Sequence, residues 1–178
     1  MIITISGLPG SGKSTIGKML AEKLGYRFYS IGDLRGKMAM DRGMTIEEFN
    51  ALGEKEAWTD KEADEYQVAL AKREDNFIID GRVSFYFIPQ SFKIFLTVDP
   101  DVAAARVFVH TRPDEKQAAT VAERKALQAE RVSSDALRYK KYYGLTYPDP
   151  KAFDLVIDTT NLTPKAILDK ILRALPKP

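Results

Sequence analysis

One eight-residue pattern near the N-terminus limits the fold more than any other feature of the sequence. Residues 7–14 read Gly-Leu-Pro-Gly-Ser-Gly-Lys-Ser, between a short β-branched run at 2–5 and apolar residues that recur at helical spacing over 13–24. Glycines let a backbone wrap with its N–H groups pointing inward, and the positive end of the following helix adds to this field. The pattern therefore predicts an anion site between a buried strand and a helix.

The same pattern, G-x-x-x-x-G-K-[ST], is typical of the P-loop of proteins that bind nucleoside triphosphates. We expect Lys13 to neutralise the β- and γ-phosphates and the Ser14 hydroxyl to ligate Mg²⁺, so that the predicted cofactor is ATP with Mg²⁺. The alternative, a glycine-rich turn with a chance lysine, is disfavoured by the strand, the spacing and the helix. The residues predicted to bind this cofactor are Gly7, Pro9, Gly10, Ser11, Gly12, Lys13, Ser14 and Thr15.

Segments of strand character alternate with helical patterns along the chain, which is typical of a parallel sheet with helices on both faces. We therefore predict a single α/β P-loop domain over residues 1–178, doubly wound, with the first strand at the centre. The five expected strands are short β-branched or aromatic runs at 2–5, 27–29, 77–79, 93–96 and 155–157.

Two intervals between the expected strands are too long for a single crossover helix. Residues 33–73 contain two or three amphipathic patterns, with helix starts expected at Thr45 and Thr59. Residues 113–143 are highly charged and poor in large aliphatic side chains, which predicts a helical flap over the sheet edge. We interpret the two intervals as moving parts, an insert that binds the acceptor and a lid.

Composition excludes several kinds of function. The 27 cationic and 25 acidic side chains nearly cancel, so the chain lacks the basic field that non-specific nucleic-acid binding requires. Without cysteine it has no disulfide, no thiolate metal site and no cysteine nucleophile. The N-terminal apolar run over 1–5 is far too short for a signal-peptide core or a membrane span. We expect a cytoplasmic protein with small-molecule partners and no nucleic-acid or membrane partner.

Charged residues within the predicted lid share one face of a helix. Arg131, Asp135 and Arg138 stand at i, i+4 and i+7, and Arg124 lies one heptad earlier. Arginines on one side of a lid would clamp phosphate oxygens, and phosphoryl transfer is catalysed mostly by positioning and charge neutralisation. The alternative is a solvated helix stabilised by ion pairs, which is the interpretation that we favour for Arg124.

Several segments resemble those of nucleoside monophosphate kinases. They are Ser30-Ile31-Gly32-Asp33-Leu34-Arg35, Phe77-Ile78-Ile79-Asp80-Gly81-Arg82, the R-x-x-x-D-x-x-R element at 131–138, Tyr142-Tyr143-Gly144 and Asp154-Leu155-Val156-Ile157-Asp158-Thr159. Together they resemble the cytidylate kinase family, in particular its short archaeal branch, over nearly the whole chain. The resemblance implies a monomer that transfers the γ-phosphoryl group of ATP to CMP or dCMP, giving the diphosphate and ADP.

The resemblance also implies roles for the residues on the predicted lid. It implies that Arg131 and Arg138 contact phosphates and that Asp135 lies near the sugar of the acceptor. The predicted catalytic residues are therefore Lys13, Arg131, Asp135 and Arg138.

The turn after the third expected strand adds a second group. Asp80 ends an apolar strand at the carboxyl edge of the sheet, where ligands of open α/β folds bind, and a carboxylate there can hold water on Mg²⁺. The resemblance implies that Asp80 serves the metal shell with Ser14 and that Arg82 binds the acceptor phosphate, whereas a local Asp80–Arg82 pair is the alternative. The residues predicted to bind the acceptor are Ser30, Asp33, Arg35, Asp80, Gly81 and Arg82.

One position departs from the family pattern. Gly36 stands where adenylate kinases and many cytidylate kinases carry the arginine of the acceptor segment. A shift of one residue turns a helical side chain by about 100°. Arg35, Lys37 or Arg42 could take the role of that arginine.

Five other residues are weighed as site candidates and assigned to the scaffold. His110, the only histidine, is expected at the surface or at a helix cap. Trp58 with Tyr66 could line a base pocket, but packing is the favoured interpretation. Asp60 and Asp64 could recognise an amino group of a base, but a solvated acidic face is the favoured interpretation.

Two other functions stay open. One is a small-molecule kinase of similar architecture, acting on another nucleoside monophosphate or on a hydroxylated metabolite such as shikimate. The other is an ATP-dependent switch protein, which would need a water-positioning residue and an apolar partner surface, and the sequence shows neither convincingly. Base choice between cytosine and uracil, and sugar choice between ribose and deoxyribose, depend on pocket geometry.

Overall fold

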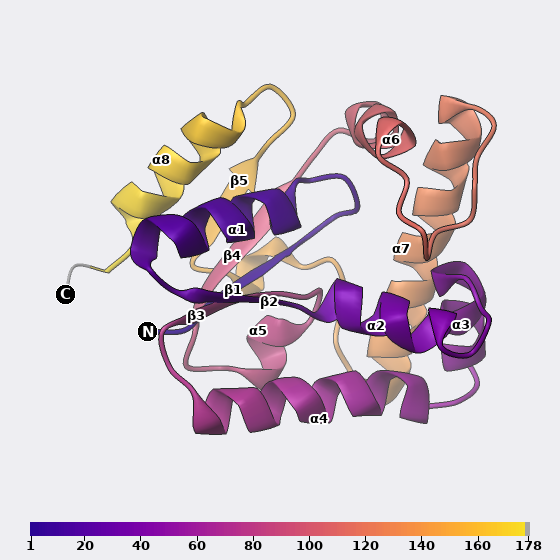
Figure 1. The fold of residues 1–178 in the computed structure, drawn as a ribbon, viewed down its shortest axis with the longest axis horizontal. Helices are drawn as coiled ribbons and strands as arrows, with labels where there is room; N and C mark the ends of the chain where they lie inside the picture. The colour runs from indigo at the N-terminus through magenta and orange to yellow at the C-terminus, as the bar shows by residue number, and fades with distance from the viewer. Residues whose placement is uncertain (177–178) are drawn as a thin grey trace.

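A computed structural model describes residues 1–176 of the chain as a five-stranded sheet with helices on both faces (Figure 1). All neighbouring strands are parallel and their order is β2-β3-β1-β4-β5, so the first strand is central, as predicted. Each strand overlaps the run from which it was predicted. The strands are β1 (Ile3–Gly7), β2 (Arg27–Ser30), β3 (Phe77–Asp80), β4 (Phe92–Thr97) and β5 (Leu155–Asp158).

Helices fill the intervals between the strands, and the first of them has the predicted bounds. It ends at Gly25, which adopts φ +68° and donates its N–H to the carbonyls of the last turn. The helices are α1 (Lys13–Leu24), α2 (Ile31–Met40), α3 (Ile46–Gly53), α4 (Trp58–Arg73), α5 (Ser84–Phe87), α6 (Pro100–Val109), α7 (Val121–Tyr143) and α8 (Pro164–Ala174), with a short 3-10 helix η1 (Pro150–Ala152).

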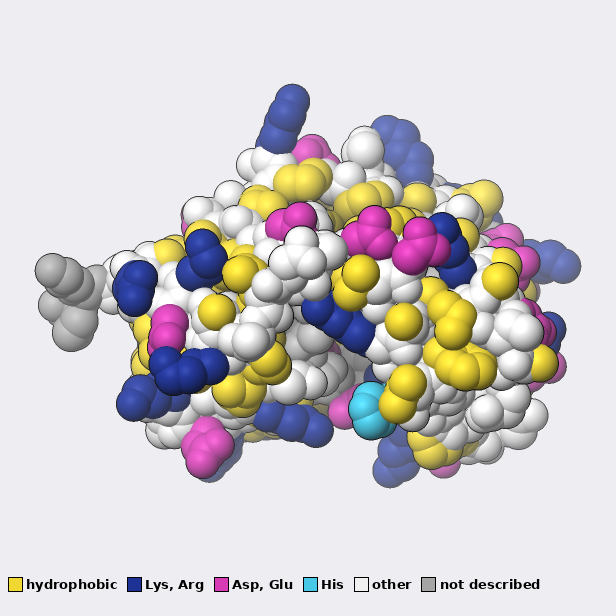
Figure 2. Space-filling view, turned by 90° about the horizontal axis from the view of Figure 1, so that it is seen from above, with side chains coloured by type: hydrophobic (Ala, Val, Ile, Leu, Met, Phe, Trp, Pro, Cys, Tyr) yellow, Lys and Arg dark blue, Asp and Glu magenta, His cyan; other side chains and the backbone are white. Residues whose placement is uncertain are grey.

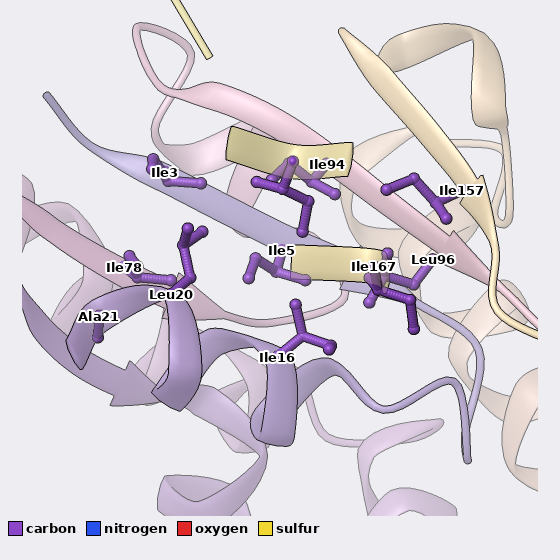
Figure 3. Packing of buried hydrophobic residues seen from close by; sticks show 11 residues of the cluster. Ile3, Ile5, Ile16, Leu20, Ala21, Ile78, Ile94, Leu96, Ile157 and Ile167 are labelled. Carbon is purple, nitrogen blue, oxygen red and sulfur yellow. The ribbon is translucent and has the colours of Figure 1, made fainter. Parts of the chain in front are cut away.

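Alternation along the strands directs side chains to the two faces of the sheet. On one face Ile3 and Ile5 of β1 pack with Ile16 and Leu20 of α1, and α8 completes the cluster with Ile167 (Figure 3). These side chains are nearly or completely buried. The central strand is therefore anchored directly beneath the helix that begins at the phosphate loop.

The other face of the sheet carries α4 and the C-terminal end of α7. Phe77 and Ile79 of β3 pack with Leu70 of α4, and Phe95 of β4 lies in a cluster with Tyr139 of α7. Burying both faces accounts for the continuous apolar runs of these strands. The predicted doubly wound α/β fold is confirmed.

The long interval after β2 forms three helices, α2, α3 and α4. Thr45 starts α3 with a capping box, in which its side chain and that of Glu48 each bond the other's backbone N–H, as the sequence predicted. A helix also starts where Thr59 predicted one, since α4 begins one residue earlier at Trp58, but the Thr59 hydroxyl donates to the carbonyl of Glu56. That hydroxyl therefore bonds backward and does not cap the first turn of α4.

The second long interval forms a loop and then α7, the longest helix among the described residues. Helix α7 runs alongside α6 and α3 and so joins the sheet to the helices of the first interval. None of the helices formed by residues 1–176 is both long and apolar enough to cross a membrane.

Candidate active site

The glycine loop between β1 and α1 has a backbone that only glycine permits at two positions. Gly7 has φ +144°, and a Cβ there would lie 2.2 Å from the carbonyl oxygen of Leu96. Gly10 has φ +73°, and its Cβ would lie 2.7 Å from the carbonyl oxygen of Ala103. The backbone of neighbouring segments thus packs directly against the loop. This close packing fixes the curved path of the loop and therefore the direction of its N–H groups.

Lys13, the first residue of α1, folds its side chain back onto the loop. Its Nζ donates to the carbonyl oxygen of Leu8 at 2.8 Å. Burial and the neighbouring Arg82 lower the pKa of Lys13 to about 7. An anion bound beside the ammonium group would favour its charged form, so the site is built to gain a negatively charged ligand.

Ser14 and Asp80 bring two hard oxygen donors together next to the loop. Parallel pairing of β1 with β3 aligns Ile5 with Asp80 at the carboxyl edge of the sheet. There the Ser14 hydroxyl donates to Asp80 Oδ2 at 2.5 Å. Mg²⁺ prefers one or two such protein oxygens completed by water and substrate phosphates, so this donor set fits the predicted metal. Within residues 1–176 no cluster of three or more His or acidic side chains offers a metal site independent of a ligand.

A cavity of about 300 Å³ opens at the carboxyl edge of the sheet, between the loop and helices α2, α3 and α7. In Figure 2, cationic side chains are visible in a hollow of the molecular surface. Four predicted site residues do not line the cavity: Gly7, Ser11, Asp33 and Arg138. Those that do are Pro9, Gly10, Gly12, Lys13, Ser14, Thr15, Ser30, Arg35, Asp80, Gly81, Arg82, Arg131 and Asp135.

Five alternating charges lie in the cavity wall and behind it, and we call them the buried ladder: Arg35, Asp60, Arg138, Asp135 and Arg82. Arg35 donates to Asp60 at 2.7 Å, and Arg138 donates to both Asp60 and Asp135. Asp135 also pairs with Arg82. Each of these side chains is at most 12% exposed. The ladder therefore links α2, α4, α7 and the turn after β3.

The ladder keeps its central carboxylate ionised. Burial disfavours the charged form of Asp135, but Arg82, Arg138 and Arg131 outweigh this and lower its pKa. Arg131 lies on the cavity side of Asp135 and donates to Glu115 at 3.0 Å. Burial and Arg82 both lower the pKa of Arg131. At this side of the cavity the ionised carboxylate of Asp135 therefore lies among crowded guanidinium groups.

Two lid arginines do not lie where the sequence placed them. Arg138 is fully buried and bonds Asp60 and Asp135, so it supports the carboxylate instead of making the predicted phosphate contact at the cavity. The solvated position favoured for Arg124 is wrong, because its side chain is 2% exposed and donates to the Lys116 carbonyl at 2.7 Å. The sequence correctly placed these residues on one face of a helix, but the loop before α7 covers Arg124 on that face.

The two acidic residues of α4 are also buried, so the favoured solvated face is wrong. Asp60 is 3% exposed and belongs to the ladder. Asp64 is 8% exposed and accepts hydrogen bonds from Tyr143 and Gln67. Burial raises the pKa of Asp64 to about 6. The acidic face of α4 is thus turned inward, toward α2 and α7.

The aromatic residues and the histidine that were weighed as site candidates have mostly structural roles. Trp58 is 40% exposed, packs edge-on against Phe49 at 5.9 Å between ring centroids, and with Tyr66 lies outside the cavity lining. His110 caps the C-terminus of α6, as predicted. It also lines the cavity, which its lone position in the sequence gave no reason to expect.

Of the three candidates for the acceptor-segment arginine, only Arg35 lines the cavity. Lys37 is exposed, and Arg42, in the turn after α2, donates to the carbonyl oxygen of Met38 and lies over the ring of Trp58. Gly36 is tightly covered, because a Cβ there would lie 2.5 Å from Asp114 Oδ2.

Several residues that line the cavity belong to no sequence motif and were not predicted. Arg112 bonds Asp33 at 3.0 Å and Asp114 at 2.9 Å, and Glu115 bonds Arg131. Asn50 of α3 also reaches the cavity. These residues come from separate loops and helices with no shared motif, so only the folded chain brings them together.

The geometry agrees with what comparison with known proteins shows. The model of the cytidylate kinase-like family matches residues 2–161. The chain belongs to this family. This cytidylate kinase-like chain is 35% identical over 175 residues to cytidylate kinase of Methanobrevibacter smithii, with 98% of each chain covered. It is 34% identical over 175 residues to that of Methanococcoides burtonii, covering 98% of this chain and 97% of the relative.

Solved structures confirm the fold of this cytidylate kinase-like protein. Shikimate kinase from Bacteroides thetaiotaomicron is similar with a TM-score of 0.68 and 16% identity, covering 97% of each chain. Shikimate kinase from Aquifex aeolicus gives a TM-score of 0.59 and 21% identity over 98% of this chain and 95% of that one. At such identities the likeness shows the fold alone. Family membership, in contrast, confirms the resemblance read from the sequence and makes the chain a nucleoside monophosphate kinase.

Proposed function

We propose that this kinase transfers the γ-phosphoryl group of ATP to CMP or dCMP, giving ADP and the nucleoside diphosphate. The observation that supports this most directly is the cavity, in which Lys13 and the Ser14–Asp80 pair lie with Arg82, Arg131 and Asp135. A cation-rich cavity beside a phosphate loop suits an acceptor that already carries a phosphate.

The loop and its two oxygen donors would hold the ATP side of the reaction. Backbone N–H groups and Lys13 would bind the phosphates, and Ser14 with Asp80 would hold Mg²⁺. The bound metal ion would neutralise charge on the transferred group. In the transfer, an oxygen of the acceptor phosphate bonds to the γ-phosphorus while the bond to the β,γ-bridging oxygen breaks and leaves ADP.

The opposite side of the cavity would hold the acceptor. Arg82, Arg131 and Arg35 are three of the four arginines that line it, and these would bind the acceptor phosphate. Asp135 is ionised and has an oxygen near the cavity, so it would accept from a sugar hydroxyl. Ser30 caps α2 through its side chain and lines the same wall.

We also propose that residues 33–73 and 113–143 act as an acceptor-binding insert and a lid. The cavity lies between these segments and the loop, so closing them over both nucleotides would exclude water. Hydrogen exchange measured with and without ATP and CMP should show new protection over 113–143. Equal protection in both samples would contradict the lid.

A panel of acceptors tests the activity, read as ADP release with ATP. CMP and dCMP should be phosphorylated faster than AMP and GMP, and cytidine should be a poor substrate. Each charge-assisted bond to the missing phosphate contributes about 1.5–3 kcal/mol, so two of them predict discrimination of several orders of magnitude. Phosphorylation of cytidine or shikimate as efficient as that of CMP would overturn the assignment and leave a kinase of another acceptor.

Asp135→Asn tests the sugar contact separately. The variant should weaken turnover of CMP, and it should affect CMP more than dCMP if the carboxylate accepts from the 2′-hydroxyl. The ratio of kcat/KM for the two acceptors is the measurement. Equal losses would instead assign Asp135 to holding Arg82 and Arg138 in place.

A further inference from the structure

Asn50 is a polar residue of the cavity wall that the predicted site does not include. It lies on α3 one turn after Ile46, and both side chains line the cavity. Asn50 is 3% exposed and Ile46 is 1% exposed. A buried amide in a cavity wall needs hydrogen-bond partners on both of its ends.

The buried ladder fixes which end of the Asn50 amide faces the cavity. Its Oδ1 accepts from Arg35 at 3.0 Å and lies 3.5 Å from the donor nitrogen of Arg138. Guanidinium groups have donors only, so reversing the amide would set its NH₂ group against two cations. The oxygen must therefore face the ladder, and the NH₂ group is the polar end left for the cavity.

Apolar side chains also line the cavity. Ile46, one turn before Asn50 on α3, lies beside the amide, and Ile31 and Tyr139 line the wall nearer the turn after β3. Apolar walls with a few fixed polar groups are what bind and orient a heterocyclic ring. A fixed N–H donor in such a wall recognises a ring atom that accepts a hydrogen bond.

We infer that Asn50 reads the base of the acceptor nucleotide by donating an amide N–H to ring nitrogen N3 of a pyrimidine. This inference rests on the proposed function. In cytosine N3 is an acceptor, whereas in uracil N3 carries a hydrogen and would oppose the amide donor. Asn50 thereby favours CMP over UMP. Arg138 acts as a positioning residue, and it holds the amide in one orientation together with the Arg35 nitrogen that bonds Asn50 Oδ1.

The variant Asn50→Asp tests the inference while keeping the shape of the side chain. The carboxylate still accepts from Arg35 and Arg138, but it offers no donor to the cavity. The kcat/KM for CMP should fall at least tenfold while that for UMP holds or rises, so that the CMP-to-UMP ratio changes by more than tenfold. The same change at exposed Asn161, outside the cavity lining, should leave the ratio as it is.

A substrate analogue makes the same test on the parent protein. CMP in which N3 is replaced by C–H should lose at least tenfold in kcat/KM with the parent and lose nothing further with Asn50→Asp. An unchanged CMP-to-UMP ratio in a variant that still melts cooperatively and binds ATP would overturn the inference. So would an equal penalty for the analogue in parent and variant. If the parent phosphorylated no monophosphate at all, the proposed function would fail, which is a separate result.

Discussion

The phosphate loop and the buried ladder meet at one cavity, but they are built in opposite ways. The loop is a run of eight residues that acts through its backbone and one lysine. The ladder joins side chains from four separate elements, and each of its two carboxylates pairs with two of its three arginines. The charge of the loop is left for a ligand, whereas the ion pairs of the ladder also hold helices together. Damage to the loop should therefore affect chemistry alone, and damage to the ladder should affect stability as well.

The largest expected effect is on the loop. Lys13→Ala should lower kcat/KM at least a thousandfold because it removes charge from the phosphate site, and it should leave the melting temperature within a few degrees because the side chain makes no core contact. Exposed Lys18 lies on the same helix, and Lys18→Ala is the matched control. Turnover by Lys13→Ala within tenfold of the parent would contradict the role given to the lysine.

On the ladder, Asp60→Asn should lower the free energy of unfolding by about 3 kcal/mol. The variant leaves Arg35 and Arg138 buried without the carboxylate that both of them bond. Urea denaturation gives the stability, and turnover of CMP should fall in the same variant because Arg35 lines the cavity. A loss of stability below 0.5 kcal/mol would show that the ladder does not hold the insert to α7.

Asp64 sharpens the comparison, because it is a buried carboxylate of α4 outside the ladder. Burial raises the pKa of Asp64 from 3.8 to about 6, so the folded state binds more protons than the unfolded state between these values. The stability of the parent should therefore fall as pH rises from 4 to 6. Asp64→Asn should remove this slope and so gain on the order of 2 kcal/mol relative to the parent across the window.

Urea denaturation of parent and Asp64→Asn at several pH values measures that slope. Gln67 can accommodate the new amide, since its Oε1 is buried and has no hydrogen-bond partner within residues 1–176. Parallel pH profiles for the two proteins would contradict the raised pKa of Asp64.

The smallest effect is expected at the surface of the same helix. Glu62 of α4 lies 3.8 Å from Arg42 in an ion pair whose side chains are 60% and 37% exposed. Glu62→Gln should change the free energy of unfolding by less than 0.5 kcal/mol, because solvent screens exposed pairs. A change as large as that of Asp60→Asn would erase the distinction between buried and exposed charge on α4.

Local sequence patterns were sufficient for the loop and for the elements around it. The glycine spacing and Gly25 predicted the loop and α1 with its observed bounds, and the run before the loop predicted β1 to within one or two residues at each end. Five short β-branched or aromatic runs predicted five strands. The argument is strongest for β1 and β3, because a strand buried on both faces needs continuous apolar residues whatever its neighbours are. Thr45 and Glu48 predicted the start of α3, because a capping box is completed within four residues.

Charged side chains were predicted less well, because their meaning depends on what covers them. The sequence showed Arg124, Asp60 and Asp64 on helix faces, but a solvated face and a buried face have the same spacing. The contact between Arg138 and Asp60 spans 78 residues, and no local pattern specifies it. By itself the sequence therefore determined the fold and the phosphate loop. Only the tertiary structure decided which charges face a ligand and which face each other, because burial and pairing are properties of packed elements and not of one segment.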